Sequence, residues 1–88
     1  MAETTGNTAF IKAADAAKTL TYQPTNDELL ELYAFFKQGT VGDNDTPRPG
    51  MFDIKGKAKH DAWSAKKGLT KEDAQAKYVE LVEALKLK

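Results

Sequence analysis

The sequence has no cysteine, which excludes disulfide bonds, thiol nucleophiles and metal or iron–sulfur sites built on cysteine. It also has no apolar run that approaches the length of a transmembrane helix, so we expect no stable insertion into a membrane. No charge of one sign predominates, because 13 Lys and Arg residues balance 13 Asp and Glu residues. A chain without net charge has no overall field that would attract nucleic acid, and we expect no nucleic-acid partner.

The amount of apolar sequence fits one small domain. The chain has 88 residues, of which 41% are apolar and 30% are charged. This length is enough for one packed core, and we expect residues 1–88 to form a single domain. Without disulfides, its stability must come from packed secondary structure. The first seven residues are polar and lack the apolar core of a signal peptide, so we expect a cytoplasmic protein.

Apolar residues recur at helical spacing in four stretches of the chain, at residues 10–20, 29–36, 58–65 and 74–85. Thr25 followed by Glu28 is the pattern of a capping box and predicts the start of the second helix. Gly68 is expected to end the third helix, and Thr70 to begin the fourth. No segment alternates apolar and polar residues as a half-buried strand does. The sequence therefore predicts an all-α fold of four helices.

The connection between the second and third predicted helices, from Gly39 to about Ile54, is long for a compact bundle. Its prolines and glycines predict turns, and its length favours a crossover connection that also has a functional role. Asp43 begins a stretch that resembles the start of a calcium-binding loop. Arg48, however, stands where that loop needs glycine, and Ile54 stands where it needs glutamate. We therefore expect no metal site.

Candidate catalytic residues are few. Ser64 is the only serine and His60 the only histidine, and they stand four positions apart on the third predicted helix. No third residue that would orient His60 is evident, nor is an oxyanion hole, so both residues are expected to be solvated polar side chains. We expect no enzyme activity and no catalytic residues.

Aromatic and basic residues form a pattern that suits a nucleotide. The candidates are Tyr33, Phe36 and Lys37 in the second predicted helix, Lys55 and Lys59 in the third, and Tyr78 in the fourth. Rings can hold a base, ammonium groups can bind a phosphate, and a phenol can donate a further hydrogen bond. Rings at helical spacing are also typical of a plain core, and lysine runs are typical of a solvated face. The spacing alone therefore leaves both interpretations open.

Three segments of the sequence together resemble one known family. They are Tyr33-Ala-Phe-Phe-Lys-Gln-Gly-Thr-Val-Gly42, Arg48-Pro-Gly50 and Lys55-Gly-Lys-Ala-Lys-His-Asp-Ala-Trp63. This combination is similar to that of the acyl-CoA-binding protein family, and the similarity extends from about Phe10 to Leu87. The resemblance implies that residues 1–88 form a single acyl-CoA-binding domain. The implied fold is a four-helix up-down-down-up bundle with a long crossover loop between helices two and three.

The resemblance also implies roles for particular residues. Lys37 and Lys59 would bind the ribose 3′-phosphate of one long-chain fatty acyl-CoA. Tyr33 and Phe36 would hold its adenine, and Tyr78 would contact both the nucleotide and the acyl region. The remaining implied residues are Lys18 and Lys55 at the edge of the site, and Ala14, Leu29 and Leu30 around the acyl chain.

The implied function is that of an intracellular carrier and pool former for long-chain acyl-CoA, with transient contacts to enzymes that use this ligand. Such a protein needs no cofactor and is expected to be a monomer. An alternative is a helical protein-interaction module whose aromatic and lysine face binds an acidic peptide. The chain departs from the family pattern at Phe36, Gly39 and His60, where tyrosine, alanine and tryptophan are common. At Gly39 the change is expected to loosen the end of the second helix by about 1 kcal/mol.

Overall fold

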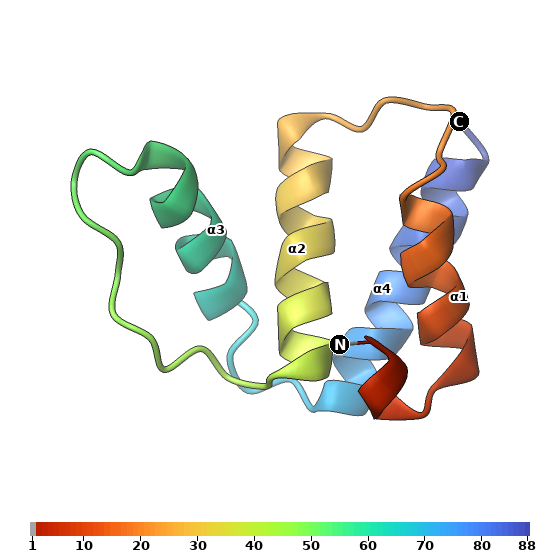
Figure 1. Ribbon diagram of the computed structural model, residues 1–88, viewed down its shortest axis with the longest axis horizontal. Helices are drawn as coiled ribbons and strands as arrows, with labels where there is room; N and C mark the ends of the chain where they lie inside the picture. Colours follow the sequence, from red (N-terminus) through yellow and green to blue (C-terminus); the bar gives the residue numbers. More distant parts are fainter. Residues whose placement is uncertain (1) are drawn as a thin grey trace.

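The computed structural model describes residues 2–88, and helices are the only regular elements within them (Figure 1). Their bounds are Ala2–Thr5 for the 3₁₀ helix η1, Thr8–Ala17 for α1, Asn26–Thr40 for α2, Ile54–Ser64 for α3 and Lys71–Lys86 for α4. The all-α prediction is confirmed, and the four α-helices lie near the four predicted stretches. Among these residues, no helix is both long enough and apolar enough to cross a membrane.

α2 is the central helix of the bundle. It packs between α4 and α3, and no other helix in residues 2–88 comes close to the backbone of α3. α1 packs against α4, whereas the backbones of α1 and α2 stay apart within the same residues. Figure 1 shows α1 and α4 running in one direction and α2 and α3 in the other. This is the expected up-down-down-up arrangement, with a crossover loop between the parallel helices α2 and α3.

Local capping places two helix starts where the sequence predicts them. At α2, the Thr25 hydroxyl accepts a hydrogen bond from the Glu28 N–H at 3.2 Å, and Glu28 Oε1 accepts one from the Thr25 N–H at 2.8 Å. These two bonds form a complete capping box. At α4, the Thr70 hydroxyl accepts a hydrogen bond from the Asp73 N–H at 3.1 Å. Both starts are confirmed, because each depends only on residues three positions apart.

The end of α2 differs from the prediction. The helix includes Gly39 and continues to Thr40, so the loop spans residues 41–53 instead of beginning at Gly39. Gly39 is buried, and a Cβ atom here would lie 3.0 Å from Cγ of Gln75 in α4. The Gln75 side-chain amide also donates a hydrogen bond to the Gly39 carbonyl oxygen at 2.8 Å. Glycine therefore lets α2 and α4 approach closely, and this tertiary contact outweighs its low helix propensity.

α3 begins at the predicted end of the connection, about Ile54, and ends earlier than predicted. The Asp53 carboxylate accepts a hydrogen bond from the Gly56 N–H at 2.9 Å and caps the first turn. The helix ends at Ser64, and residues 65–68 form turns that lead to Gly68. Gly68 has a φ of 98°, which is the left-handed conformation expected of it. It is the last residue of these turns, however, and does not itself end the helix.

Three aromatic rings, one each from α1, α2 and α4, form the centre of the core. The centroid of the Phe10 ring lies 5.6 Å from that of Phe36 and 5.2 Å from that of Tyr78, and the last two lie 5.8 Å apart. Phe10 is fully buried, and Tyr78 is 5% exposed. Leu20 follows the end of α1 and packs against this core from the connection. The hydrophobic core therefore lies where α1, α2 and α4 meet.

Polar side chains hold the 41–53 loop against α3. The buried Asn44 amide donates hydrogen bonds to the His60 carbonyl oxygen at 3.3 Å and to the Ser64 hydroxyl at 3.1 Å. Nε2 of His60 lies 2.9 Å from the carbonyl oxygen of Thr46. The expectation that Ser64 and His60 are solvated is therefore wrong, because both are half-buried and hold the loop.

Two further contacts fix this loop. The Arg48 guanidinium donates two hydrogen bonds to the Asp61 carboxylate of α3, at 3.1 and 2.9 Å. At the start of the loop, Asp43 accepts hydrogen bonds from the Gly68 N–H at 2.9 Å and from the Gln38 amide at 2.8 Å. These bonds, first that from Gly68, lower the pKa of the Asp43 carboxyl group. Asp43 is thus an anchor for the loop, and residues 2–88 contain no cluster of three side chains suited to a metal ion.

Lys88 ties the end of α4 to the start of α2. Its ammonium group lies 2.7 Å from the Glu28 carboxylate and 5.1 Å from the centroid of the Tyr22 ring. The Tyr22 hydroxyl donates a hydrogen bond to the same carboxylate at 2.9 Å. The hydrogen bond from Lys88, followed by that from the Thr25 N–H, lowers the pKa of Glu28 from 4.5 to about 2. The fold therefore favours the ionised form of Glu28.

We predict that Glu28 makes stability depend on pH in acid. Because its pKa is depressed in the folded state, its stabilising effect is complete above pH 4.5 and is lost as the pH falls toward about 2. Chemical denaturation of the protein and of Glu28→Gln should show a stability difference that is constant near neutral pH and shrinks within this window. Lys88→Gln should weaken this pH dependence. A difference that stays the same at every pH would contradict the role assigned to Glu28.

Removal of the Asn44 amide should destabilise the fold. Asn44→Ala leaves the Ser64 hydroxyl and the His60 carbonyl without this donor, and should lower the free energy of unfolding by about 1–3 kcal/mol. Asp45→Ala, at an exposed position of the same loop, is the matched control and should change it by less than about 0.5 kcal/mol. Equal effects of the two substitutions in urea denaturation would show that this anchor does not stabilise the fold.

Candidate ligand-binding site

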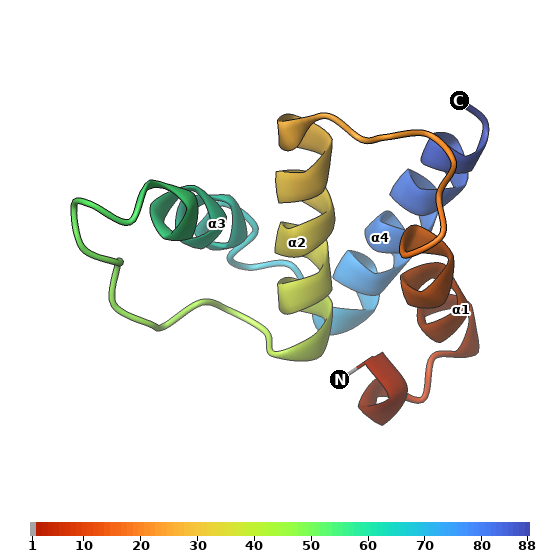
Figure 2. The same cartoon turned by 45° about the horizontal axis from the view of Figure 1, so that its top comes forward.

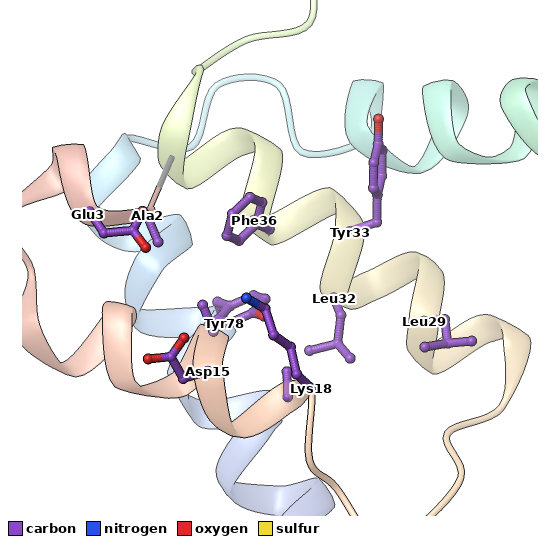
Figure 3. Close-up of a pocket in the computed structure, with 11 residues that line it drawn as sticks. Ala2, Glu3, Asp15, Lys18, Leu29, Leu32, Tyr33, Phe36 and Tyr78 are labelled. Atoms are coloured by element: carbon purple, nitrogen blue, oxygen red, sulfur yellow. The ribbon is translucent and has the colours of Figure 1, made fainter.

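A cavity lies on one side of α2 and a groove on the other. The first, which we call the α1–α2 cavity, lies between α1 and α2 and is also lined by Tyr78 of α4 (Figure 3). Its volume is about 400 Å³. The second, the α2–α3 groove, has a volume of about 460 Å³. Both volumes are in the range of small-molecule sites. Leu29 and Tyr33 line both spaces, so α2 forms their shared wall.

The wall of the α1–α2 cavity is mostly apolar. Its apolar lining includes Ala14, Ala17, Leu29, Leu32 and Phe36. Lys18 also lines the cavity, and Figure 3 shows its long side chain extending across the front of the cavity in that view. Glu3 and Asp15 are the other charged residues of the lining. The apolar part of this wall suits an alkyl chain.

Tyr78 adds a neutral polar group to this wall. Its ring belongs to the aromatic core, and its side chain lines the cavity. Burial raises the pKa of the Tyr78 phenol, so the hydroxyl stays protonated at neutral pH. A neutral phenol can donate a hydrogen bond to a polar atom of a ligand in the cavity.

The α2–α3 groove has a basic wall. Lys55 and Lys59 stand one turn apart on α3 and line it together with Leu30 and Ile54. Nζ of Lys59 lies 5.5 Å from the centroid of the Tyr33 ring. Figure 3 shows this ring pointing from α2 toward α3. The groove therefore combines an aromatic ring, aliphatic side chains and ammonium groups, which suits an anionic ligand with a planar ring.

Lys37 lines neither space but lies close to α3. Its Nζ lies 4.9 Å from the centroid of the Trp63 ring, and the Trp63 indole N–H donates a hydrogen bond to the Gly42 carbonyl oxygen at 2.8 Å. Lys37 is thus on the side of α2 that faces α3, as is the ring of Tyr33. Neither Lys37 nor Lys59 forms an ion pair with the residues that the structure describes. Both ammonium groups are therefore available to bind an anionic group of a ligand.

All of the expected site residues except Lys37 line the cavity or the groove. Ala14, Lys18, Phe36 and Tyr78 line only the cavity, Leu30, Lys55 and Lys59 line only the groove, and Leu29 and Tyr33 line both. Residues that share one implied role are divided between the two spaces. Phe36, expected beside adenine, packs in the apolar cavity, and Leu30, expected beside the acyl chain, lies with the lysines.

Several lining residues were not predicted from the sequence. Ala2 and Glu3 belong to η1, for which the sequence has no periodic apolar signal. Ile54 is the first residue of α3, where the predicted connection was still expected. Leu32 did carry a signal, because it stands three positions after Leu29 on the same helix, but this spacing equally suits a core residue.

Comparison with known proteins gives consistent matches. The family model for acyl-CoA-binding protein matches residues 7–82. The acyl-CoA-binding protein homolog 1 of Caenorhabditis elegans is 66% identical over 77 residues, which cover 88% of this chain and 90% of that protein. The acyl-CoA-binding protein homolog of Drosophila melanogaster is 54% identical over 76 residues, with coverages of 86% and 88%.

Solved structures agree with the sequence matches. The crystal structure of Oryza sativa acyl-CoA-binding protein 2 superposes with a TM-score of 0.84 at 44% identity, covering 88% of this chain and 86% of that one. The solution structure of the yeast acyl coenzyme A binding protein gives a TM-score of 0.71 at 47% identity, with coverages of 89% and 91%. These matches span most of the chain in both sequence and fold. The protein belongs to the acyl-CoA-binding protein family.

Proposed function

We propose that the protein binds one long-chain fatty acyl-CoA, with its acyl chain in the α1–α2 cavity and its nucleotide head group in the α2–α3 groove. The observation that carries this proposal is the presence of two spaces with different walls that share Leu29 and Tyr33. A ligand with an apolar tail and an anionic head can extend from one to the other across α2. The names of the relatives, all acyl-CoA-binding proteins, support the same ligand.

The acyl chain would lie against Ala14 and Leu29. Burial of each methylene in such a wall contributes about 0.8 kcal/mol. Phe36 packs against Tyr78 at the base of the cavity, and we assign its ring to the acyl chain and not to adenine. Lys18 and the Tyr78 hydroxyl would bind the polar segment that joins the chain to the nucleotide.

The head group would lie against Tyr33, whose ring faces α3 and can stack on adenine, with Leu30 beside it. We assign Lys37 and Lys59 to the 3′-phosphate, and Lys55 to the edge of the same site. Both Lys37 and Lys59 lie over aromatic rings at the junction of α2 and α3. A phosphate would give each a charge-assisted hydrogen bond, which is a stronger interaction than an exposed cation–π contact.

We propose that the protein is a carrier and pool former for this ligand and not an enzyme. Free long-chain acyl-CoA is an amphiphile that enters membranes, and a protein that covers its chain keeps it in water. Ser64 and His60 are engaged in holding the loop, which leaves neither placed as a nucleophile or a base. The proposal includes a cytoplasmic monomer without a cofactor that contacts acyl-CoA-using enzymes transiently.

A module that binds an acidic peptide would use the lysines and rings of the groove. It would leave the α1–α2 cavity without an occupant, although this cavity is as large as a small-molecule site. An acyl-CoA uses both spaces. The geometry therefore favours the acyl-CoA ligand over the peptide.

Both halves of the ligand should be needed for tight binding. In calorimetry, palmitoyl-CoA should bind at least about tenfold more tightly than CoA or palmitate, because each of the latter occupies only one space. Ala14→Phe should weaken palmitoyl-CoA but leave CoA unchanged, whereas Ala76→Phe, at an exposed position of α4, should affect neither. Equal affinity for palmitate and palmitoyl-CoA would rule out the role of the groove.

The 3′-phosphate should be recognised by Lys37 and Lys59 together. A charge-assisted hydrogen bond contributes about 1.5–3 kcal/mol, so Lys59→Ala should weaken palmitoyl-CoA roughly tenfold to a hundredfold. The double variant Lys37→Ala, Lys59→Ala should lose most of the discrimination against 3′-dephospho-palmitoyl-CoA. Lys12→Ala, at an exposed position of α1, is the control and should retain it. Full discrimination by the double variant would mean that other residues hold the phosphate.

A further inference from the structure

The turn that precedes α3 and the first residue of that helix expose three large apolar side chains. The Asp53 N–H donates a hydrogen bond to the Gly50 carbonyl oxygen at 3.0 Å, so Met51 and Phe52 occupy the corners of a tight turn. Met51 is 74% exposed, Phe52 93% and Ile54 74%. Turn corners favour Gly, Pro, Asn, Asp and Ser, so turn formation does not explain two large apolar residues there. We call Met51, Phe52 and Ile54 the apolar tip.

The apolar tip lies at the outer end of the molecule, next to the α2–α3 groove. In Figures 1 and 2 the turn before α3 lies on the side of the molecule away from α1 and α4. Ile54 belongs to the tip and also lines the groove, as does the next residue, Lys55. A surface that covers the tip would therefore also adjoin the opening of the groove.

Positively charged side chains lie next to the apolar tip in the sequence. Residues 51–59 contain lysines at 55, 57 and 59 and a single acid, Asp53. The Asp53 carboxylate is engaged in capping α3. Nζ of Lys57 donates a hydrogen bond to the Met51 carbonyl oxygen at 2.9 Å, which places this ammonium group against the turn. Protruding apolar side chains beside cations suit an anionic membrane surface, because the apolar groups enter the interface while the cations meet lipid phosphates.

We propose that the apolar tip docks the protein on the surface of an anionic membrane. Met51 and Phe52 enter the interfacial layer, and Lys55 and Lys57 lie at the level of the phosphates. This contact is peripheral and reversible, and it inserts no helix. A stable protein partner fits less well, because the three side chains of the tip cover less area than a standard protein interface requires.

Docking places the groove at the lipid surface. An acyl-CoA that is anchored in the membrane by its chain would then present its head group to Lys55 and Lys59 while its chain is still in lipid. This consequence rests on the proposed function, whereas the docking itself does not. The two can therefore be tested separately.

Co-sedimentation of the ligand-free protein with lipid vesicles tests the docking. Vesicles of equal parts phosphatidylcholine and phosphatidylserine should bind the protein more tightly than phosphatidylcholine alone, and added salt should weaken this binding. The double variant Met51→Ser, Phe52→Ser should bind the mixed vesicles at least about tenfold less tightly. Leu87→Ser removes a side chain that is 90% exposed elsewhere on the chain, and as the matched control it should bind like the wild type.

Calorimetry without vesicles separates docking from ligand binding. The double variant should bind palmitoyl-CoA within about twofold of the wild type, because neither Met51 nor Phe52 lines the cavity or the groove. Wild-type protein that binds mixed vesicles but not palmitoyl-CoA would support docking and contradict the proposed function. Docking would be overturned if the wild type and the double variant bound vesicles equally, or if the wild type did not bind them. The tip would then be assigned to a protein partner.

Discussion

The contact among Phe10, Phe36 and Tyr78 sets the geometry on which the rest of the structure depends. Each ring comes from a different helix, and their centroids lie 5.2, 5.6 and 5.8 Å apart. Rings of this size fill the centre of the bundle and join α1 to α2 through side chains, while the two backbones stay apart within residues 2–88. The space left between the two helices is the α1–α2 cavity. Two of these three rings, Phe36 and Tyr78, therefore also line the candidate site.

The position of α3 depends on a different set of contacts. Trp63 is its only buried residue, so apolar packing alone holds it weakly. Hydrogen bonds from Asn44 and Arg48 attach the loop to α3, and the Lys66 ammonium lies 2.9 Å from Glu31 of α2. These polar contacts place Lys59 over Tyr33 and so create the basic groove. Both faces of α2 thus meet mostly apolar spaces that differ in charge, because Glu3, Asp15 and Lys18 line the cavity whereas Lys55 and Lys59 line the groove. This difference favours the groove for an anionic head group.

Local signals were sufficient to predict most of the helices, and the family resemblance supplied the topology. The capping box at Thr25 depends on residues three positions apart, so it could be predicted from the sequence alone. Gly39 was misassigned to the loop because the reason for its place in α2 is a contact with Gln75, 36 positions away. The residue types of the candidate site were equally apparent in the sequence, but their division between two spaces was not. Spacing shows that Leu30 and Phe36 lie on different faces of α2, but only tertiary structure shows which helix covers each face.

The central claim is that one ligand occupies both sides of α2. Two alanine methyl groups report on the two sides, because Ala14 lines only the cavity and Ala58 lines only the groove. Intermolecular nuclear Overhauser effects between labelled protein and palmitoyl-CoA test the claim most directly. The structure predicts contacts from the alkyl chain protons to Ala14 and from the adenine protons to Ala58 and Tyr33. Alkyl contacts to Ala58 together with adenine contacts to Ala14, or contacts confined to one side of α2, would contradict it.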